Sequence, residues 1–473
     1  MKLLRVLYVT AELSPFTGDS ALARESRFLS QEMAQLGLDV TLMVPGRAMT
    51  DPDSMGLARR LTPLVLSDPD REVTIYEGAT PGGRVEVIAI QVPDEIDQTG
   101  VTPGETADET FCRAVHALID QRDDPPNVVL ASHGGEGVLT AFATTEPTER
   151  MPLPEPAEGL PSPPAGEQGA RPAALVFALR RFEESAQLVE TLGHSDLVMV
   201  PSSHWAQALR EAPDSHRAGA LVGPVAQRVR GVTPGIDSLE WNPRRDSSVA
   251  ADFLADPAGH KARHKETLQR QLGLRVTPRL PLIALVGPVD PTSLTYTAAT
   301  ELSQRNIELV VLANRQRDHE TLRGLDRLAN QSSTRIAIRT PDDPHDARTF
   351  EHTLMAAADF ALFAPPPGPG TLSELYCMHY GAVPIAPRSG TFADTLVEFD
   401  SVTATGSGFL FEPGDGEHLV AAVDRALRVY ARPGSTSALT GRAIEMDLSW
   451  QTAAQRYVNL FLEVLREKGQ LAA

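Results

Sequence analysis

Short apolar runs recur along the chain, and most are followed by a longer segment whose apolar positions repeat with a helical period. Runs of this length, rich in β-branched residues, are typical of strands buried on both faces of a sheet. A strand, a helix and a second parallel strand form one crossover unit, so their alternation predicts a doubly wound α/β fold. The predicted strands cover residues 4–9, 40–44, 127–130, 175–178, 196–200, 282–286, 308–312, 334–338, 359–363 and 383–386. The run at 282–286 begins a second parallel sheet, which indicates two Rossmann-like domains.

The stretch 368–398 combines a Gly/Pro-rich loop with a predicted helix over residues 372–380. Thr371 is a candidate N-cap, and Glu374 follows it at the spacing of a capping box. The first-turn amides of a helix lack internal partners and carry the positive end of the helix dipole, so they suit a diphosphate. We therefore expect Thr371, Leu372 and Ser373 to offer amides to an anion.

A second loop repeats this arrangement after the strand at 383–386. Ser389, Gly390 and Thr391 open another predicted helix, which runs on from Phe392. Two anion-receptive helix starts around one parallel strand are typical of the nucleotide half of a doubly wound domain. An ordinary pair of turns between strand and helix explains the same spacing, so the pattern alone leaves both interpretations open.

Composition and charge indicate the class of protein and exclude some kinds of binding partner. Hydrophobic residues make up 42% of the chain and charged residues 22%, which is typical of a globular protein. The formal charge of −19 argues against a nucleic-acid partner or an anionic membrane surface. The two cysteines, Cys112 and Cys377, cannot form a disulfide framework and favour a reducing cytoplasm. Arg5 interrupts the apolar N-terminal run, which favours a first strand over a signal peptide, and no run is long enough for a membrane span.

One segment is predicted to lack a fixed fold. Residues 146–171 are rich in Pro, Glu and Gly. Such a composition buries too little apolar surface to offset the entropy of ordering. We expect a flexible loop within the first domain.

Three stretches carry a resemblance to a known family. They are LSELYCMHYGAVPIAPRSGTFADTLVEFD, then Gly235-Ile236-Asp237 with Trp241-Asn242-Pro243, and Asp447-Leu448-Ser449-Trp450. Together they resemble the bacterial glycogen synthases and plant starch synthases, and the resemblance extends from Val9 to Leu465. It implies two Rossmann-like doubly wound domains facing across a cleft, the GT-B-like architecture. The expected domains are 1–243, on the acceptor side, and 244–447, on the nucleotide side, with a terminal helix within 448–473 that returns to the first domain. The family transfers glucose from ADP-glucose to an α-1,4-glucan and uses neither metal nor cofactor.

This chain departs from the family pattern where the chemistry would lie. Three positions that would carry a cation for the donor diphosphate hold Gly18, Pro288 and Ser293, and Asp19 and Asp290 add negative charge. The family's catalytic Glu falls on Gly368 and its active-site His on Ala178, while His133 is the titratable group left in the loop that approaches the acceptor sugar. A lone loop histidine is more often structural than catalytic.

Other residues remain as candidates for binding a nucleotide or another anion. Ser20 and Ala21 occupy the family's two glycines in the first anion-binding loop. The complete candidate set is Ser20, Ala21, Thr371, Leu372, Ser373, Arg388, Gly390, Thr391 and Phe392. Candidate replacement cations are Arg24, Arg47, Arg180 and Arg388. Arg388 stands out because it lies on the loop before Gly390.

Two hypotheses follow. In the first, the chain is a glycogen-synthase-like protein whose transferase chemistry is impaired or lost and which acts as a binding or regulatory module, a pseudoenzyme. In the second, it is a working retaining glycosyltransferase with a donor site rebuilt for another nucleotide sugar. An active ADP-glucose synthase is a third reading, which requires every substitution to be tolerated. The expected ligands are a nucleotide sugar resembling ADP-glucose or an α-glucan, and the sequence names no protein partner.

Overall fold

A computed structural model describes most of the chain and divides it into two compact units. The first unit comprises Met1–Val200, Leu209–Val232 and Trp450–Ala473, and the second comprises Pro201–Ala208 and Thr233–Ser449. The described residues are 4–18, 20–49, 55–66, 71–92, 106–144, 173–180, 185–212, 219–237, 241–243, 245–246, 249, 257–286, 293–313, 319–341, 343–365, 373–432, 439–442, 444 and 446–470. The expected flexible loop at 146–171 lies outside these residues.

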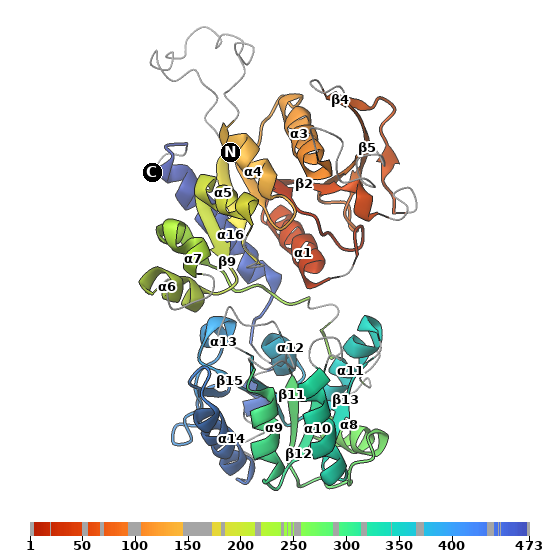
Figure 1. The fold of residues 1–473 in the computed structure, drawn as a ribbon, viewed down its shortest axis with the longest axis vertical. Coiled ribbons are helices and arrows are strands. Elements are labelled where there is room, and N and C mark those ends of the chain that lie inside the picture. The colour runs from red at the N-terminus through yellow and green to blue at the C-terminus, as the bar shows by residue number, and fades with distance from the viewer. Residues whose placement is uncertain are drawn as a thin grey trace. The chain divides into compact units, whose positions relative to one another are not determined.

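The first unit is built on one sheet whose central strands are parallel (Figure 1). The strand order is β10-β9-β8-β7-β1-β2-β6-β5-β3, and β4 pairs with β5. The hairpin β5–β6 is antiparallel. The strands are β1 Arg5–Val9, β2 Asp39–Pro45, β3 Ala58–Arg59, β4 Leu64–Leu66, β5 Arg71–Ala79, β6 Glu86–Gln91, β7 Val128–Ala131, β8 Ala174–Ala178, β9 Leu197–Val200 and β10 Val229–Gly231.

Helices accompany these strands as crossovers or cover a face of the sheet. They are α1 Ala21–Gln35, η1 Gly46–Ala48, α3 Ala107–Asp120, α4 Glu136–Thr144, α5 Ala186–His194, α7 Gly219–Val222, η3 Gly223–Arg228 and α16 Trp450–Glu467, while α6 Ser203–Glu211 begins in residues of the second unit and ends in residues of the first. The first strand shows why its sequence forms a central strand. Val6, Leu7, Tyr8 and Val9 are all buried, so both faces of β1 are covered and neither requires polar residues.

The second unit repeats the architecture with a smaller sheet of the order β13-β12-β11-β14-β15-β16, and each neighbouring pair is parallel. Separate apolar clusters cover its two faces. The strands are β11 Leu282–Val286, β12 Glu308–Leu312, β13 Ile336–Arg339, β14 Phe360–Phe363, β15 Val383–Pro387 and β16 Phe409–Phe411. The helices are α8 Pro257–Gln271, α9 Thr295–Ser303, α10 His319–Gln331, α11 Pro344–Ala357, α12 Ser373–His379, α13 Gly390–Thr395 and α14 Gly416–Tyr430. The predicted fold class, two doubly wound α/β units with parallel sheets, is confirmed.

Helix α16 belongs to the first unit although it lies at the far end of the sequence. It packs against α1. Its apolar stripe enters the core formed by β1, β2 and α1, and Tyr457 and Phe461 are fully buried there. The last chain segment therefore completes one face of the first sheet.

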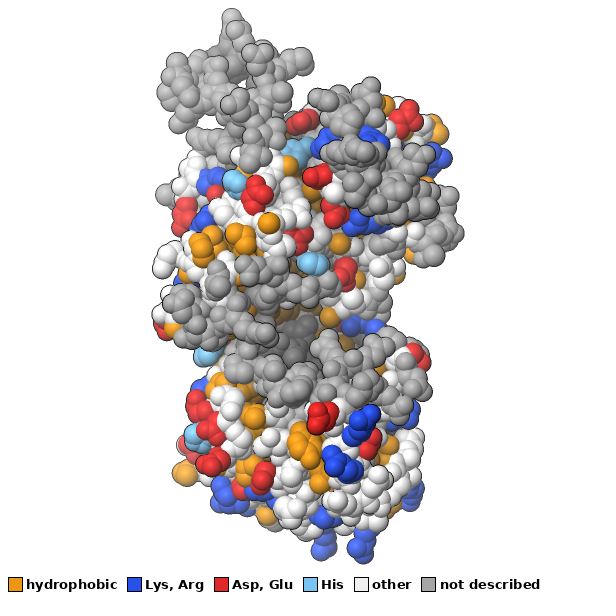
Figure 2. All heavy atoms as spheres, in the orientation of Figure 1, with side chains coloured by type: hydrophobic (Ala, Val, Ile, Leu, Met, Phe, Trp, Pro, Cys, Tyr) orange, Lys and Arg blue, Asp and Glu red, His pale blue; other side chains and the backbone are white. Residues whose placement is uncertain are grey.

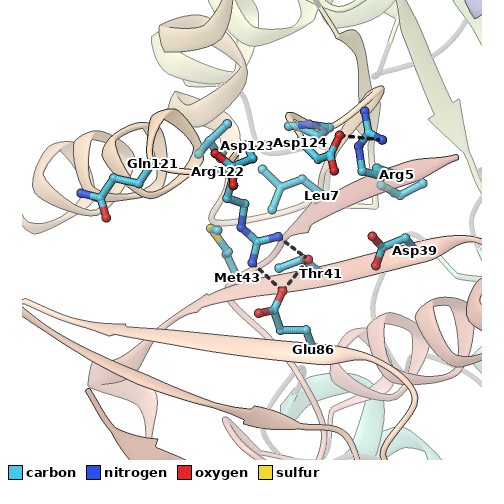
Figure 3. A pocket seen from close by; sticks show the side chains of 13 residues that line it. Arg5, Leu7, Asp39, Thr41, Met43, Glu86, Gln121, Arg122, Asp123 and Asp124 are labelled. Carbon is cyan, nitrogen blue, oxygen red and sulfur yellow. Dashed lines mark hydrogen bonds and ion pairs between the residues drawn. The ribbon is translucent and has the colours of Figure 1, made fainter. Parts of the chain in front are cut away.

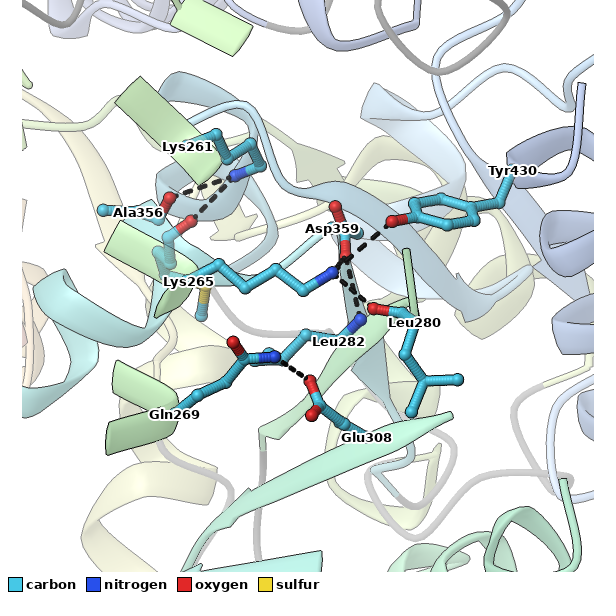
Figure 4. A network of polar contacts seen from close by, with 10 residues as sticks. Lys261, Lys265, Gln269, Leu280, Leu282, Glu308, Ala356, Asp359 and Tyr430 are labelled. Atoms are coloured by element: carbon cyan, nitrogen blue, oxygen red, sulfur yellow. Dashed lines mark hydrogen bonds and ion pairs between the residues drawn. The ribbon is translucent and has the colours of Figure 1, made fainter. Parts of the chain in front are cut away.

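A buried polar face on α8 anchors that helix to the second unit (Figure 4). Lys261, Lys265 and Gln269 are spaced four residues apart, so they lie on one face of the helix. The Lys261 ammonium donates to the carbonyls of Met355 and Tyr380, at 3.2 and 3.1 Å. Both acceptors lie near the carboxyl ends of helices, where carbonyls are left without intrahelical partners.

The neighbouring lysine has a different partner. Lys265 forms an ion pair of 2.7 Å with Asp359, and Asp359 also accepts a hydrogen bond from the Leu282 amide at the start of β11. Burial lowers the pKa of Lys261 to about 8, and Asp359 opposes this shift. Burial lowers the pKa of Lys265, but Asp359 and Tyr430 together outweigh burial, so the pKa is raised.

The stability of the second unit should therefore depend on pH through Lys261. The folded pKa lies below that of the unfolded chain, so the contribution is complete above about pH 10.4 and is lost as pH falls through about 8. Relative to Lys261→Met, the unfolding free energy of the wild type should rise by about 2 kcal/mol between about pH 8 and pH 10. Calorimetric unfolding at a series of pH values measures this difference. The transition of the first unit is the internal control, and parallel pH curves for the two proteins would contradict the prediction.

Candidate functional site

The first unit has a topological switch point between β1 and β7. From β1 the chain continues to β2 and β6 on one side, whereas from β7 it continues to β8, β9 and β10 on the other. The loops that follow β1 and β7 are joined, because the Ala11 amide donates to the His133 carbonyl at 3.1 Å and the Ser132 amide donates to the Val9 carbonyl at 3.0 Å. In doubly wound sheets, ligands bind outside the carboxyl ends of strands at such a point.

The loop after β1 holds three predicted site positions. Gly18 is exposed, has a φ of +124° and contributes no side chain where the resemblance would place a cation. Ser20 is the N-cap of α1, and its hydroxyl accepts the Ala23 amide at 3.0 Å and bonds the Glu12 carboxylate. Ala21 is the exposed first residue of the helix. Ser20 is therefore engaged in capping, and the charge that this loop presents beside it is negative.

The loop after β7 positions an imidazole next to a carboxylate. His133 Nδ1 lies 3.0 Å from Glu136 Oε1, and the Gly134 amide donates to the other carboxylate oxygen at 2.7 Å. Gly134 has a φ of +84°, and a Cβ there would lie 2.2 Å from that of Ala11. Only glycine fits this turn, and the turn fixes where His133 stands. His133 was among the predicted site residues and Glu136 was not, although a carboxylate three residues after a loop histidine is a signal that the sequence contains.

The next strand of the sheet carries a buried ion pair. Ala178 ends β8 and is buried, and Arg180 follows it. Arg180 Nε donates to Glu25 of α1 at 2.7 Å, and its Nη2 bonds both Glu25 and the hydroxyl of Tyr457 on α16. Burial lowers the pKa of Arg180, but Glu25, Tyr457 and Tyr8 together outweigh burial, so the pKa is raised. This guanidinium is held inside the first unit.

The remaining candidate cations differ in exposure and pairing. Arg47 is paired with Asp108 at 2.7 Å. Arg24 lies in the first turn of α1 and is half-buried, whereas Arg388 is exposed. Of the four candidates, Arg47 and Arg180 therefore have their charge compensated by a carboxylate of the same unit.

The second unit has its own switch point between β11 and β14. The Leu294 amide donates to the Ala364 carbonyl at 3.1 Å and joins the segments that follow these two strands. Ser293 is buried there, and its hydroxyl donates to Thr295 Oγ1 at 3.1 Å. Pro288, Gly368, Thr371 and Leu372 lie outside the described residues, while the backbone of Ser373 begins α12.

The loop after β15 brings together the remaining predicted residues. The amide of Arg388 donates to the Phe411 carbonyl at 2.7 Å while its side chain is exposed. Gly390 begins α13 with a φ of +55°, two residues before the predicted start at Phe392, and the Thr391 and Phe392 side chains are buried. Thr391 and Phe392 can therefore offer only backbone groups to a ligand.

An acidic residue in α13 has a role that sequence reasoning missed. The Asp394 carboxylate accepts the amides of Ser203 and His204 at 2.8 and 2.9 Å and the Thr233 hydroxyl at 3.2 Å. It therefore caps the start of α6 and binds a neighbouring loop. The partners lie far away in the sequence, so no local pattern pointed to this contact.

A hollow of about 420 Å³ lies at the opposite, amino end of the first sheet (Figure 3). Leu7 and Met43 form part of its apolar wall, and Asp39, Glu86 and Arg122 supply charge. Arg122 pairs with Glu86 and also donates to Thr41 at 3.0 Å. This cavity lies across the sheet from the switch-point loops and is separate from the predicted site.

The described residues contain no group of three or more side chains arranged to hold a metal ion. None of the described helices is both long and apolar enough to cross a membrane. On the face shown in Figure 2, acidic and basic side chains are interspersed among the described residues.

No family model matches the chain. A glycogen synthase of Syntrophotalea carbinolica is 26% identical, with 97% of this chain and 98% of the relative aligned. Glycogen synthase 1 of Methylococcus capsulatus is 25% identical, with 98% and 97% aligned. The catalytic domain of starch synthase IV from Arabidopsis thaliana, solved with ADP and acarbose, superimposes with a TM-score of 0.75 at 20% identity and covers 98% of this chain and 100% of that domain.

The two doubly wound units have the GT-B fold of that starch synthase domain. The chain is similar over its full length to curated glycogen synthases, at 25–26% identity.

Breaking the buried ion pair between Arg180 and Glu25 should destabilise the first unit strongly. Arg180→Met leaves Glu25 buried without its partner, and we expect a loss of about 3–5 kcal/mol. Arg47→Met removes an exposed pair and should cost less than about 1 kcal/mol. Urea unfolding followed by a signal from the first unit compares the two. The double variant Glu25→Leu, Arg180→Met should recover most of the loss, because it buries no unpaired charge, and equal losses for Arg47→Met and Arg180→Met would contradict the account.

Proposed function

We propose that this glycogen-synthase-like protein binds a nucleotide sugar or an α-glucan and does not carry out efficient glucosyl transfer. It then acts as a binding or regulatory module. The proposal rests on the charged side chains described in the first unit: the expected cation is missing, and two candidate replacements are paired with carboxylates. The loop after β1 has Gly18 at the expected cation and Glu12 beside Ser20, while Arg47 and Arg180 are paired with Asp108 and Glu25.

Transfer without a metal requires fixed positive charge at the departing diphosphate. Preorganised charge aimed at the transition state is commonly the largest contribution to catalysis, and loss of one such group costs about 10²–10³ in rate. In the second unit, the expected cation positions hold Pro288 and Ser293. Ser293 is neutral and its hydroxyl is bonded to Thr295. Several losses do not simply add, but they act in one direction.

Ligand binding depends less on these side chains. Amides in the first turns of α12 and α13 belong to the backbone, which the substitutions leave in place. Binding of a nucleotide is supported by this geometry, whereas acceleration requires interactions that are stronger in the transition state than in the ground state. Binding and catalysis should therefore be separable in this protein.

A radiolabelled transfer assay with ADP-glucose and a glycogen primer, run beside a calorimetric titration with ADP, tests the proposal. We expect no detectable elongation, together with saturable binding of ADP or of a malto-oligosaccharide. Turnover within about a hundredfold of the ~10 s⁻¹ typical of enzymes would overturn the inactive assignment. Binding of neither ligand would overturn the assignment as a binding module.

The alternative is an active transferase with a rebuilt donor site. The exposed side chain of Arg388, on the loop between β15 and α13, is the observation that favours it. If UDP-glucose or another nucleotide sugar supports transfer, Arg388→Ala should lower kcat by about 10²-fold or more. Arg428→Ala, an exposed arginine in the last turn of α14, is the matched control and should leave kcat unchanged. Equal rates for the two variants would remove Arg388 from the donor site.

A further inference from the structure

Arginines from several segments gather at the amino end of the second sheet. Neighbouring parallel strands begin at the same edge of a sheet, so the connections that lead into them converge there. In Figure 2, Lys and Arg side chains lie along the lower end of the second unit. The residues that we call the arginine surface are Arg275 and Arg279 between α8 and β11, Arg305 before β12, Arg335 before β13, and Arg428 and Arg432 at the end of α14.

Hydrogen bonds join the segments that carry these arginines. The Arg275 amide donates to the Thr334 carbonyl at 2.9 Å, directly before Arg335. The Arg335 guanidinium donates to the Arg305 carbonyl at 2.7 Å. The Arg305 guanidinium in turn donates to both carboxylate oxygens of Asp424 on α14, at 2.8 and 3.2 Å. The connection to β11, the starts of β12 and β13, and α14 are therefore contiguous.

A second link joins the connection to β11 with the end of α14 (Figure 4). The Lys265 ammonium donates to the carbonyl of Leu280, the residue after Arg279. The same ammonium donates to the hydroxyl of Tyr430, the last residue of α14, at 3.4 Å. Arg279 is thereby placed on the same side of the sheet as Arg432, which follows the helix.

The arginine surface carries more positive charge than its surroundings compensate. Arg275, Arg279, Arg428 and Arg432 are exposed, whereas Arg305 and Arg335 are half-buried. Several carboxylates at this end are already paired or covered: Asp424 is paired with Arg305, Asp359 is paired with Lys265, and Glu308 is fully buried. The exposed carboxylates of the neighbouring helices are Glu301 on α9 and Asp326 on α10. A local excess of positive charge thus stands on a chain whose net charge is −19.

Helix dipoles explain part of this arrangement. Cations are favourable near the carboxyl end of a helix. This accounts for Arg428 in the last turn of α14, and for Arg335, which donates to a carbonyl just after α9. Arg275 and Arg279 lie in the connection after α8 and outside the described helices. Their charge is exposed without a helix terminus of their own, so the surface has more arginines than capping requires.

The side chains favour one class of anionic partner. The guanidinium group matches the planar fork of a carboxylate and also binds phosphate. Proteins that bind single-stranded nucleic acid commonly add aromatic side chains on which the bases stack. Residues 272–281, 304–307 and 332–335 contain no aromatic side chain. An arginine surface without stacking groups suits a run of carboxylates better than a nucleic acid.

We propose that the arginine surface docks an acidic polypeptide segment, a run of Asp or Glu side chains of a partner protein. At about 0.1 M salt, charges more than about 10 Å away are largely screened, so such a segment responds to these arginines more than to the net charge of the chain. The inference goes beyond the proposed function and does not depend on it. The arginine surface lies at the amino end of the second sheet, whereas α12 and α13 start after the carboxyl ends of β14 and β15.

Fluorescence anisotropy of labelled decaglutamate, titrated with the full-length protein at about 0.1 M salt, tests the docking. The wild type should bind saturably, and binding should weaken as salt is raised. The triple variant Arg275→Ala, Arg279→Ala, Arg432→Ala should weaken binding about three- to hundredfold, the combined loss expected for three exposed ion pairs. Its affinity for ADP and for maltoheptaose should stay that of the wild type.

The matched control is the triple variant Arg59→Ala, Arg84→Ala, Arg456→Ala. These arginines are exposed on the first unit, and their removal changes the net charge by the same amount. The control should bind decaglutamate as the wild type does. Equal weakening in both triple variants would show a response to net charge alone and overturn the inference.

Three further results would also overturn it. One is a wild type that does not bind decaglutamate. Another is tighter binding of a ten-nucleotide oligothymidylate than of decaglutamate, which would assign the surface to nucleic acid. The third is self-association of the wild type in sedimentation experiments that the Arg275, Arg279 and Arg432 triple variant abolishes, because the occupant would then be a second copy of this chain. Melting temperatures of both triple variants within a few degrees of the wild type confirm that the comparison concerns folded proteins.

Discussion

The parallel pairing of β1 between β2 and β7 is the constraint on which the first unit depends. Parallel neighbours cannot be joined by a tight turn, so each connection must cross a face of the sheet, usually as a helix. Because the chain leaves β1 in one direction and continues from β7 in the other, the two following loops are not covered by a crossover between them. Their mutual hydrogen bonds through Ala11 and Ser132 follow from this reversal. The second unit has the same reversal between β11 and β14, where the Leu294 amide donates to the Ala364 carbonyl.

Strands and fold class were readable from the sequence because they depend on local composition. A strand such as β11 is buried along its whole length, so its residues form an uninterrupted apolar run. The ends of strands were predicted less accurately where the strand residues are only partly buried. Strand β13 begins at Ile336, two residues after its predicted start, and its last residue, Arg339, is exposed. The positive φ of Gly390 explains why a glycine stands at the start of α13.

The side-chain partners of the candidate site were hidden for a physical reason. Glu25 and Arg180 are 155 residues apart, and Tyr457 is 277 residues beyond Arg180. Single-sequence patterns carry no record of such pairs, so Arg180 read as a free cation while the fold uses it to join α1, β8 and α16. Glu136 differs, because its distance from His133 along the chain is within reach of a motif search. The spacing of Glu136 from His133 could therefore have been recognised in the sequence, but His133 was considered without its neighbours.

The charges of the first unit point to a division between two kinds of ligand. A diphosphate needs cations that are not already neutralised, and the first unit commits Arg180 to Glu25 and Arg47 to Asp108. A glucan is uncharged, so its binding requires hydrogen bonds and a complementary shape and no net positive charge. The overall charge of −19 acts in the same direction, because it repels an anionic donor at low ionic strength and leaves a neutral polysaccharide unaffected. A protein that does not need to transfer a sugar can lose the donor-site cations and keep its fold, because the parallel sheets do not depend on those cations. Substitution of the donor cations together with retention of the scaffold is therefore what the proposed function, binding without efficient transfer, predicts.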